Sequence, residues 1–340
     1  MAAGSLSSFI GLGRQSAQAT AAAKYWKALA TVSAMQPVFD VSESRLEHPG
    51  GTGSRNTVKK SVSARTGYLM PFKATFIARA NFLPIALIGA GFSCSTVNNS
   101  GYYTHTLTWA ASNAVPWVSA FWYVAASDNA FTVRAVDARV TKLSLNATPT
   151  EIQCELEGKG MTGSEATGSE TTTSEVAYEI LPTIGSVTVQ SGGVAIASSF
   201  RSANTEITQE LIEDDRTLFQ ASRADLPQKS IGATITLGGI DISRDFYRKL
   251  FNAGTGNTTP SLTPLTGDLS MNFQSAQFIT GSTPYSITIA APSVEFAATD
   301  NNFQAQNDDQ IRCELVAQVI DNVATPLTIT IVNNVSAYTA

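Results

Sequence analysis

Apolar and polar residues alternate along most of the chain, a pattern that is typical of half-buried β-strands. In the first half, the alternation predicts strands at 68–80, 102–110, 120–125, 131–141 and 151–159. In the second half, it predicts strands near 186–189, 198–209, 230–237, 269–278, 286–291, 294–298, 310–319 and 327–332. Their short spacing, with turn residues between them, favours a sandwich or a barrel. For the alanine-rich residues 14–35, a short helix and an extended segment both stay open.

Two short helices are expected between these strands. Asn81 is the predicted N-cap of the first helix, and Pro84 falls in its first turn, where the missing N–H leaves no helical hydrogen bond unmade. Gly91 follows the last apolar position and is expected to end this helix. Either Asp241 or Ser243 is predicted to cap the second helix.

A short segment of the sequence occurs twice. Ile-Gln-Cys-Glu-Leu at 152–156 returns 159 residues later as Ile-Arg-Cys-Glu-Leu at 311–315. A second echo joins 81–91 to 245–254, at an offset of about 163 to 164, and each of these segments reads as a helix followed by Ala-Gly. Two echoes in the same order indicate a duplicated β domain. Chance similarity between alternating strands is the alternative.

The expected organisation follows from this repeat. A chain of 340 residues is long enough for two domains that each bury a core. We expect a mainly β protein with an N-terminal β-sandwich or barrel domain at 1–159 and a C-terminal one at 179–340, each with one short α-helix. The first domain would contain a long basic loop at 43–66. Residues 160–178 are acidic and rich in Gly, Ser and Thr, which predicts a flexible linker.

Charge is divided unevenly between the two halves. Residues 1–150 carry 13 Lys plus Arg against 5 Asp plus Glu, a net of +8, whereas residues 151–340 carry 9 against 22, a net of −13. Opposite fields could steer head-to-tail contacts between copies. Chance asymmetry on two solvated domains is the alternative. The low share of charged residues, 14%, suits sheets that meet other protein surfaces.

The sequence offers little catalytic or metal-binding chemistry. Histidine occurs only at His48 and His105, and the Gly-x-Ser-x-Gly, Walker, His-Glu-x-x-His and Ca²⁺-loop motifs are not found. The three cysteines, Cys94, Cys154 and Cys313, are an odd number without CxxC spacing, which favours free buried thiols. We therefore expect a protein that is not an enzyme and needs no cofactor or metal.

Two residue clusters have a chemical as well as a structural interpretation. The first is a carboxylate cluster that could supply a glycosidase acid and base, but it is more simply a solvated segment: Glu206, Glu210, Glu213, Asp214 and Asp215. The second is an aromatic group that could stack sugars, although core or subunit packing is the simpler interpretation: Trp109, Trp117, Trp122 and Tyr123.

Neither secretion nor membrane insertion is expected. Residues 1–10 lack the basic and long apolar regions of a secretory signal, which predicts folding in the cytosol. No apolar run approaches the roughly 18 residues of a membrane-spanning helix.

Three stretches resemble the major tail tube proteins of long-tailed, siphovirus-type bacteriophages in their larger two-domain form. Residues 13–21, Gly-Arg-Gln-Ser-Ala-Gln-Ala-Thr-Ala, are similar to the N-terminal opening of this family, although Ala19 stands where glycine is usual. Residues 43–67 resemble its Glu-Ser-Arg loop followed by a Gly strand, and residues 68–91 resemble its strand and short helix.

The resemblance implies two tail-tube-like domains and a structural virion protein. Such a protein would be made in the host cytoplasm and would self-assemble into stacked rings, the conduit for DNA passage into the host. Three chains per ring, with pseudo-hexameric symmetry, are expected rather than six. The further implied partners are tape measure and terminator proteins and, transiently, viral DNA, with no membrane. Another virion component, of the capsid or baseplate, and a carbohydrate- or receptor-binding β module are the alternatives.

Candidate contact residues follow from charge and from the resemblance. The candidates for contacts between stacked rings come from the basic loop and are Arg45, Arg55, Lys59, Lys60 and Arg65. The candidates for an acidic lumen or partner surface are Glu165, Glu170, Glu175, Glu206 and Glu210.

Overall fold

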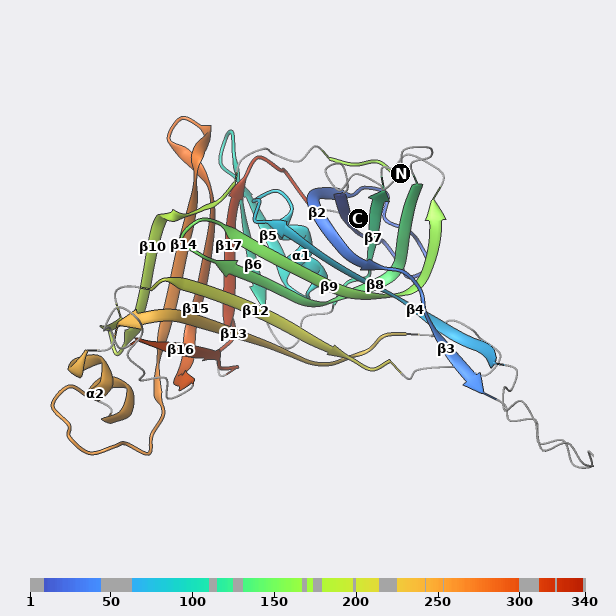
Figure 1. Cartoon of the computed structure of the whole chain (residues 1–340). Helices are drawn as coiled ribbons and strands as arrows, with labels where there is room; N and C mark the ends of the chain where they lie inside the picture. Colours follow the sequence, from blue (N-terminus) through green and yellow to red (C-terminus); the bar gives the residue numbers. More distant parts are fainter. Residues whose placement is uncertain are drawn as a thin grey trace, which may run out of the picture.

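The structure is a computed structural model of the chain. It describes residues 9–43, 63–109, 115–124, 131–166, 170–173, 179–197, 200–213, 225–241, 243–252, 254–299, 312–321 and 323–338. These residues form 17 strands and two short helices, which confirms the mainly β class (Figure 1).

The elements of the first half are β1 (Phe9–Arg14), β2 (Trp26–Met35), β3 (Val38–Glu43), β4 (Ser63–Ile77), α1 (Leu83–Gly89), β5 (Ser93–Asn98), β6 (Tyr103–Trp109), β7 (Val118–Val124), β8 (Phe131–Ala147) and β9 (Ile152–Ala166). Those of the second half are β10 (Leu181–Ser191), β11 (Val194–Ala197), β12 (Ser202–Leu211), β13 (Gln228–Asp241), α2 (Arg244–Asn252), β14 (Leu265–Thr280), β15 (Thr283–Thr299), β16 (Arg312–Val319) and β17 (Leu327–Asn333).

Six strands of the first half close into a barrel. β1 pairs with β2 and β7, β2 with β4, β4 with β9, β9 with β8, and β8 with β7, all antiparallel. Closure satisfies the backbone groups that an open sheet leaves at its edges. In Figure 1 the barrel lies on the right, and β3 with the first part of β4 extends from it as a two-stranded arm.

Glycines let aromatic rings lie directly on the barrel strands. A Cβ on Gly11 would lie 2.0 Å from Cε1 of Phe121, and a Cβ on Gly158 would lie 2.1 Å from Cζ of Phe72. Phe72 and Phe121 are each about 1% exposed. Only a residue without a side chain fits between strand and ring at these two positions.

Six strands of the second half repeat the barrel order without closing. β10 pairs with β14, β14 with β15, β15 with β16, β16 with β13, and β13 with β12. In the barrel, the same sequence of neighbours is β1, β7, β8, β9, β4 and β2. The second set stays open because β10 turns its other side to the short β11, while β12 pairs with β8 of the barrel.

The two halves are joined by strand pairing. Besides β8 with β12, β6 of the first half pairs with β17 of the second, and β17 pairs with β15. The expected tandem of two domains is therefore not confirmed, since the strands of the halves interlock. Residues 160–166, expected to begin a flexible linker, instead form the end of β9 and pair with β8. Gly160 and Gly163 fit there because Ala135 and Met70 pack against their backbone.

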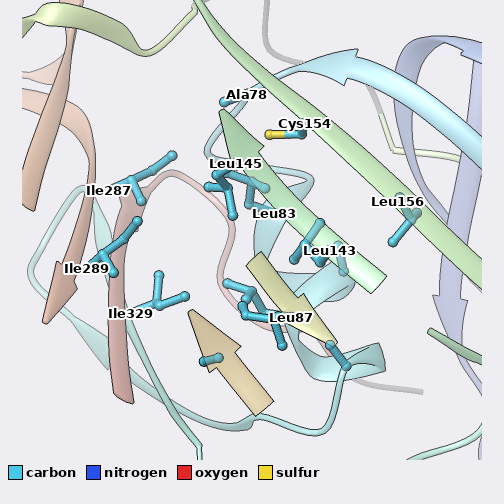
Figure 2. Packing of buried hydrophobic residues seen from close by; sticks show 14 of the residues in the cluster. Ala78, Leu83, Leu87, Leu143, Leu145, Cys154, Leu156, Ile287, Ile289 and Ile329 are labelled. Carbon is cyan, nitrogen blue, oxygen red and sulfur yellow. The ribbon is translucent and has the colours of Figure 1, made fainter. Parts of the chain in front are cut away.

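One apolar core spans both halves, and α1 lies inside it. Every residue of this seven-residue helix is buried. Figure 2 shows Leu83 and Leu87 of α1 between two groups of side chains. The barrel provides Leu143, Leu145 and Cys154, and the second half provides Ile287, Ile289 and Ile329. So short a helix is unstable alone in water, so this packing must hold it in place.

Local signals set the helix ends only in part. The N-cap of α1 is Phe82, whose side chain makes no capping hydrogen bond, so the prediction of Asn81 as the cap was wrong. The side chain of Asn81 instead donates from Nδ2 to Oδ1 of Asn334, 3.0 Å away, in the C-terminal segment. At α2, the N–H of Phe246 donates to Oγ of Ser243 at 3.0 Å, which confirms Ser243 as the cap.

The strand predictions at 286–291 and 294–298 merge into the single long strand β15. Pro292 lies between them, where the neighbour of β15 changes: Ser286–Ala290 pair with β17, and Val294–Thr299 pair with β16. Proline has no N–H to give to a ladder, so it fits at the point where one ladder ends and another begins.

The C-terminal segment crosses from β17 back to the barrel. The ring of Tyr338 packs on Trp26 of β2, with ring centroids 5.0 Å apart. The Tyr338 hydroxyl donates to the Asn81 carbonyl at 2.8 Å and accepts from Nδ2 of Asn333 at 2.9 Å. His105 donates from Nε2 to the Val335 carbonyl at 2.9 Å, which fixes its neutral tautomer. These bonds tie the end of the chain to both halves.

Candidate assembly surface

Six adjacent strands present one continuous outer face. They follow one another in the order β4, β9, β8, β12, β13 and β16 and so cross from the first half to the second. Side chains alternate along them: Leu143 and Leu156 are buried on the core side, whereas Lys142, Glu155 and Glu157 are partly exposed on the outer side.

Ion pairs form a ladder across the middle of this face. Lys73 on β4 pairs with Glu155 and, at 2.6 Å, with Glu157, both on β9. Lys142 on β8 lies 3.6 Å from Glu155 and 3.2 Å from Glu206 on β12. The ladder therefore links four strands and joins the two halves.

The ladder shifts the pKa values of Glu155 and Lys73. The hydrogen bond from Lys73 lowers the pKa of Glu155, and the bonds from Glu155 and then Glu157 raise the pKa of Lys73. These side chains are between 29% and 41% exposed, so water screens the ion pairs and each contributes little to stability. The ladder therefore matters mainly because it leaves these lysines paired within the chain.

The acidic candidates do not gather into one surface among the described residues. Glu206 pairs with Lys142 in the ladder, whereas Glu210 pairs with Lys229 at 3.0 Å. Glu170 pairs with Arg134 at 3.0 Å on the barrel. Of the remaining two candidates, Glu165 is exposed on β9, and Glu175 lies outside the described residues. Sequence alone could not show this pairing, because each cation comes from a distant part of the chain.

Most of the basic candidates lie outside the described residues, namely Arg45, Arg55, Lys59 and Lys60. The backbone of Arg65 belongs to β4 in the two-stranded arm, opposite Val41 of β3. The expected basic loop is thus shorter than predicted at its C-terminal end, because β4 already begins at Ser63.

An apolar groove of about 290 Å³ lies at the base of the arm. Phe39 of β3 and Tyr68 of β4 line it, with ring centroids 6.0 Å apart. Met70, Val133 and Pro37 complete its apolar wall. The sequence alone did not predict this groove, because its walls come from strands that are far apart along the chain.

The aromatic cluster of the sequence is dispersed in the structure. The guanidinium of Arg139 lies over Trp117, with its Cζ 4.1 Å from the centre of the Trp117 ring. Tyr123 stacks on Phe9, with their ring centroids 5.0 Å apart. Trp109 is 5% exposed and borders a polar cavity of about 520 Å³ on β13. Trp122 packs against the core. The arrangement favours packing roles over a single aromatic platform.

The described residues show no cluster of side chains that could hold a metal ion, since no group of three or more His, Cys, Asp or Glu is placed to do so. Cys94, Cys154 and Cys313 are free, and burial raises the pKa of Cys313 to about 11. Neither helix in the described ranges has the length and apolar character needed to span a membrane.

The sequence was compared with protein-family models and with curated proteins, and neither comparison gives a match.

Proposed function

We propose that this chain is a structural virion protein whose copies form the stacked rings of a bacteriophage tail tube. The observation that carries the proposal is the strand order that occurs twice, once closed and once open, with the two sets joined through β8 and β12. A chain built in this way supplies two similar units to one wall. It also fits the resemblance of residues 13–21 and 43–91 to tail tube proteins.

Ring stoichiometry follows from this arrangement. If each chain contributes two similar units, three chains give a ring with pseudo-hexameric symmetry. Mass measurement of isolated rings, or ring-averaged electron micrographs, tests this directly. Three copies per ring support the proposal, whereas six copies contradict the trimer.

The outer face with the ion-pair ladder is the proposed lumen lining. DNA is held by free cations on a protein surface, because binding releases its counterions. Lys73 and Lys142 are already occupied by Glu155, Glu157 and Glu206. A polar face whose cations are paired in this way would let the phosphate backbone pass with only transient contact.

Tube formation is the decisive experiment. Purified protein is concentrated and imaged by electron microscopy. Tubes support the proposal, and dispersed particles at every concentration contradict it. Tape measure and terminator proteins are the proposed further partners, so assembly in their presence is the natural second condition.

The basic loop is the proposed contact between stacked rings. Deletion of residues 45–60 should abolish stacking while leaving a folded protein and intact rings, because Arg45, Arg55, Lys59 and Lys60 would then no longer meet acidic groups of the next ring. Circular dichroism checks the fold. Tube growth at the rate of the intact chain would contradict this role.

A binding module is the second candidate, and one observation favours it. The polar cavity of about 520 Å³ is bordered by Trp109 and by side chains that can hydrogen-bond to sugar hydroxyls, namely Gln228, Lys229, Gln318 and Asp321. Glycan-array binding that is lost in Gln318→Ala would support this candidate, and it would be set aside if the protein forms tubes and binds no glycan. Other capsid or baseplate roles remain an alternative that the same micrographs distinguish.

A further inference from the structure

The pairing of β8 with β12 provides a template for a contact between copies. Lys142 lies opposite Thr208 and Ala147 lies opposite Ala203, so the segments 142–147 and 203–208 form one ladder. β12 thus has β13 on one side and β8 on the other.

In the barrel, β2 and β3 hold the position that β12 holds in the second half. The last residue of each copy of the repeated segment begins a row of residues that lie opposite one another on three neighbouring strands. The row in the barrel is Leu156, Ala74 and Val32. The row in the second half is Leu315, Leu237 and Ala203. Val32 therefore corresponds to Ala203.

The same correspondence reaches β3. Val38 lies opposite Leu69, and Thr208 lies opposite Gly232. Leu69 lies five positions before Ala74, and Gly232 lies five positions before Leu237, the middle residues of the two rows. Their partners therefore correspond as well, so Val38 corresponds to Thr208.

β12 uses one of its edges to pair with β8, and the corresponding edge of β2 and β3 is open among the described residues. β1 covers β2 only at Trp26–Leu29, and no strand of the described residues pairs with the same side of 32–38. Val38 is 55% exposed there. An open edge of this kind is a site for strand addition, and Pro37 restricts how a second chain can use it.

The end of β15 corresponds to the segment of β8 that fills this position. Leu156 lies opposite Leu143 of β8, and Leu315 lies opposite Ala298 of β15. β14 pairs with the far side of β15 only as far as Phe296. Residues 297–299 therefore have β16 on one side and, among the described residues, no strand on the other.

From these correspondences we infer that the end of β15 in one copy pairs antiparallel with the β2–β3 edge of a second copy, in the register of β8 with β12. Ala297 would then lie opposite Val38 of the second copy, as Lys142 lies opposite Thr208 within the chain. The inference rests on the proposed function for the identity of the occupant, a second copy.

Charge and symmetry agree with this contact. It joins the second half of one chain, with net −13 over 151–340, to the first half of the next, with net +8 over 1–150. The two surfaces differ, so the contact is head-to-tail and repeats until a ring closes.

Disulfide trapping tests the register. Val38→Cys and Ala297→Cys are made separately in a chain that carries Cys94→Ser, because the other two cysteines are buried. Mixing the two variants under mild oxidation should give a covalent dimer that neither variant gives alone. Lys142→Cys with Thr208→Cys in one chain is the matched control and should close an intrachain bridge.

A charge exchange gives a second, independent measurement. Val38→Lys with Ala297→Lys places like charges opposite each other and should weaken self-association about fivefold per contact, whereas Val38→Lys with Ala297→Glu should restore it. Sedimentation velocity measures both variants. Absence of the mixed dimer while the control bridge forms, or equal association of the two charge variants, would overturn the inference.

The two proposals can fail separately. Cross-linked rings without tubes would leave the edge contact standing and contradict the tail tube. Tubes whose Val38→Cys and Ala297→Cys variants never cross-link would keep the tail tube and reject this edge as the contact.

Discussion

Cys154 and Cys313 occupy corresponding positions in two strand pairs. Cys154 lies opposite Phe76 on β4, the strand that leads into α1, and Cys313 lies opposite Ile240 on β13, the strand that leads into α2. The cysteines are 159 positions apart, and their partners are 164 apart, which reproduces the two offsets of the sequence echoes. This correspondence supports duplication as the origin of the chain.

Gly158→Ala should destabilise the barrel strongly. The new Cβ would lie 2.1 Å from Cζ of the buried Phe72 ring, so ring and strand must separate. Overpacking of this kind costs about 1–3 kcal/mol of unfolding free energy. Urea denaturation measures it. Gly256→Ala is the matched control, because nothing lies within 4 Å of its Cβ, and an equal loss in both variants would contradict the explanation.

Leu87→Ala should destabilise both halves together. Leu87 is fully buried on α1 in the core that the halves share, so the cavity should remove roughly 2–5 kcal/mol in one cooperative transition. Near-ultraviolet circular dichroism, which reports tertiary packing, and far-ultraviolet circular dichroism, which reports the backbone, should change at the same urea concentration. The exposed Leu262→Ala serves as control and should change stability by less than about 0.5 kcal/mol. Two separate transitions would show that the halves unfold independently.

Acid should weaken the anchor of the C-terminal segment through His105. Burial lowers the pKa of His105, so the unfolded chain binds its proton more readily than the folded chain does. The stability present near neutral pH should therefore fall as pH drops below about 6.5, the ordinary histidine value. The measurement is unfolding free energy against pH. The slope between pH 7 and pH 5 should be smaller in His105→Gln than in the natural chain, and identical slopes would exclude His105 as its cause.

Lys73→Met should raise the pKa of Glu155 toward its ordinary range. The hydrogen bond from Lys73 is the largest cause of the lowered value, and the contact with Lys142 remains in the variant. Carboxyl chemical shifts followed by nuclear magnetic resonance during acid titration report the change. Glu210 is the internal control, since its pKa is lowered mainly by Lys229 and should not move. An unchanged Glu155 would show that the ladder is not formed in solution.

Local sequence patterns predicted many single elements. Alternation located most strands, and the repeated Ile-x-Cys-Glu-Leu segment located two strands that the structure places equivalently. Ser243 was found as a cap because capping needs only neighbouring residues. Asn81 was misjudged because its partner, Asn334, is 253 positions away. The candidate acidic residues failed to form one surface for the same reason, since Lys142 and Lys229 reach them only through folding.

The β class, the two helices and the internal echo can all be read from the chain before it folds, because each depends on periodicity and on near neighbours. Which strands pair with one another is fixed by contacts that form only in the folded chain. Closure through β1 and β2, the joining of β8 to β12, and the shared core around α1 depend on shape and burial between distant segments. An alternating strand offers the same backbone groups to every partner, so the choice between a closed barrel and an open set is made by the packing that surrounds it.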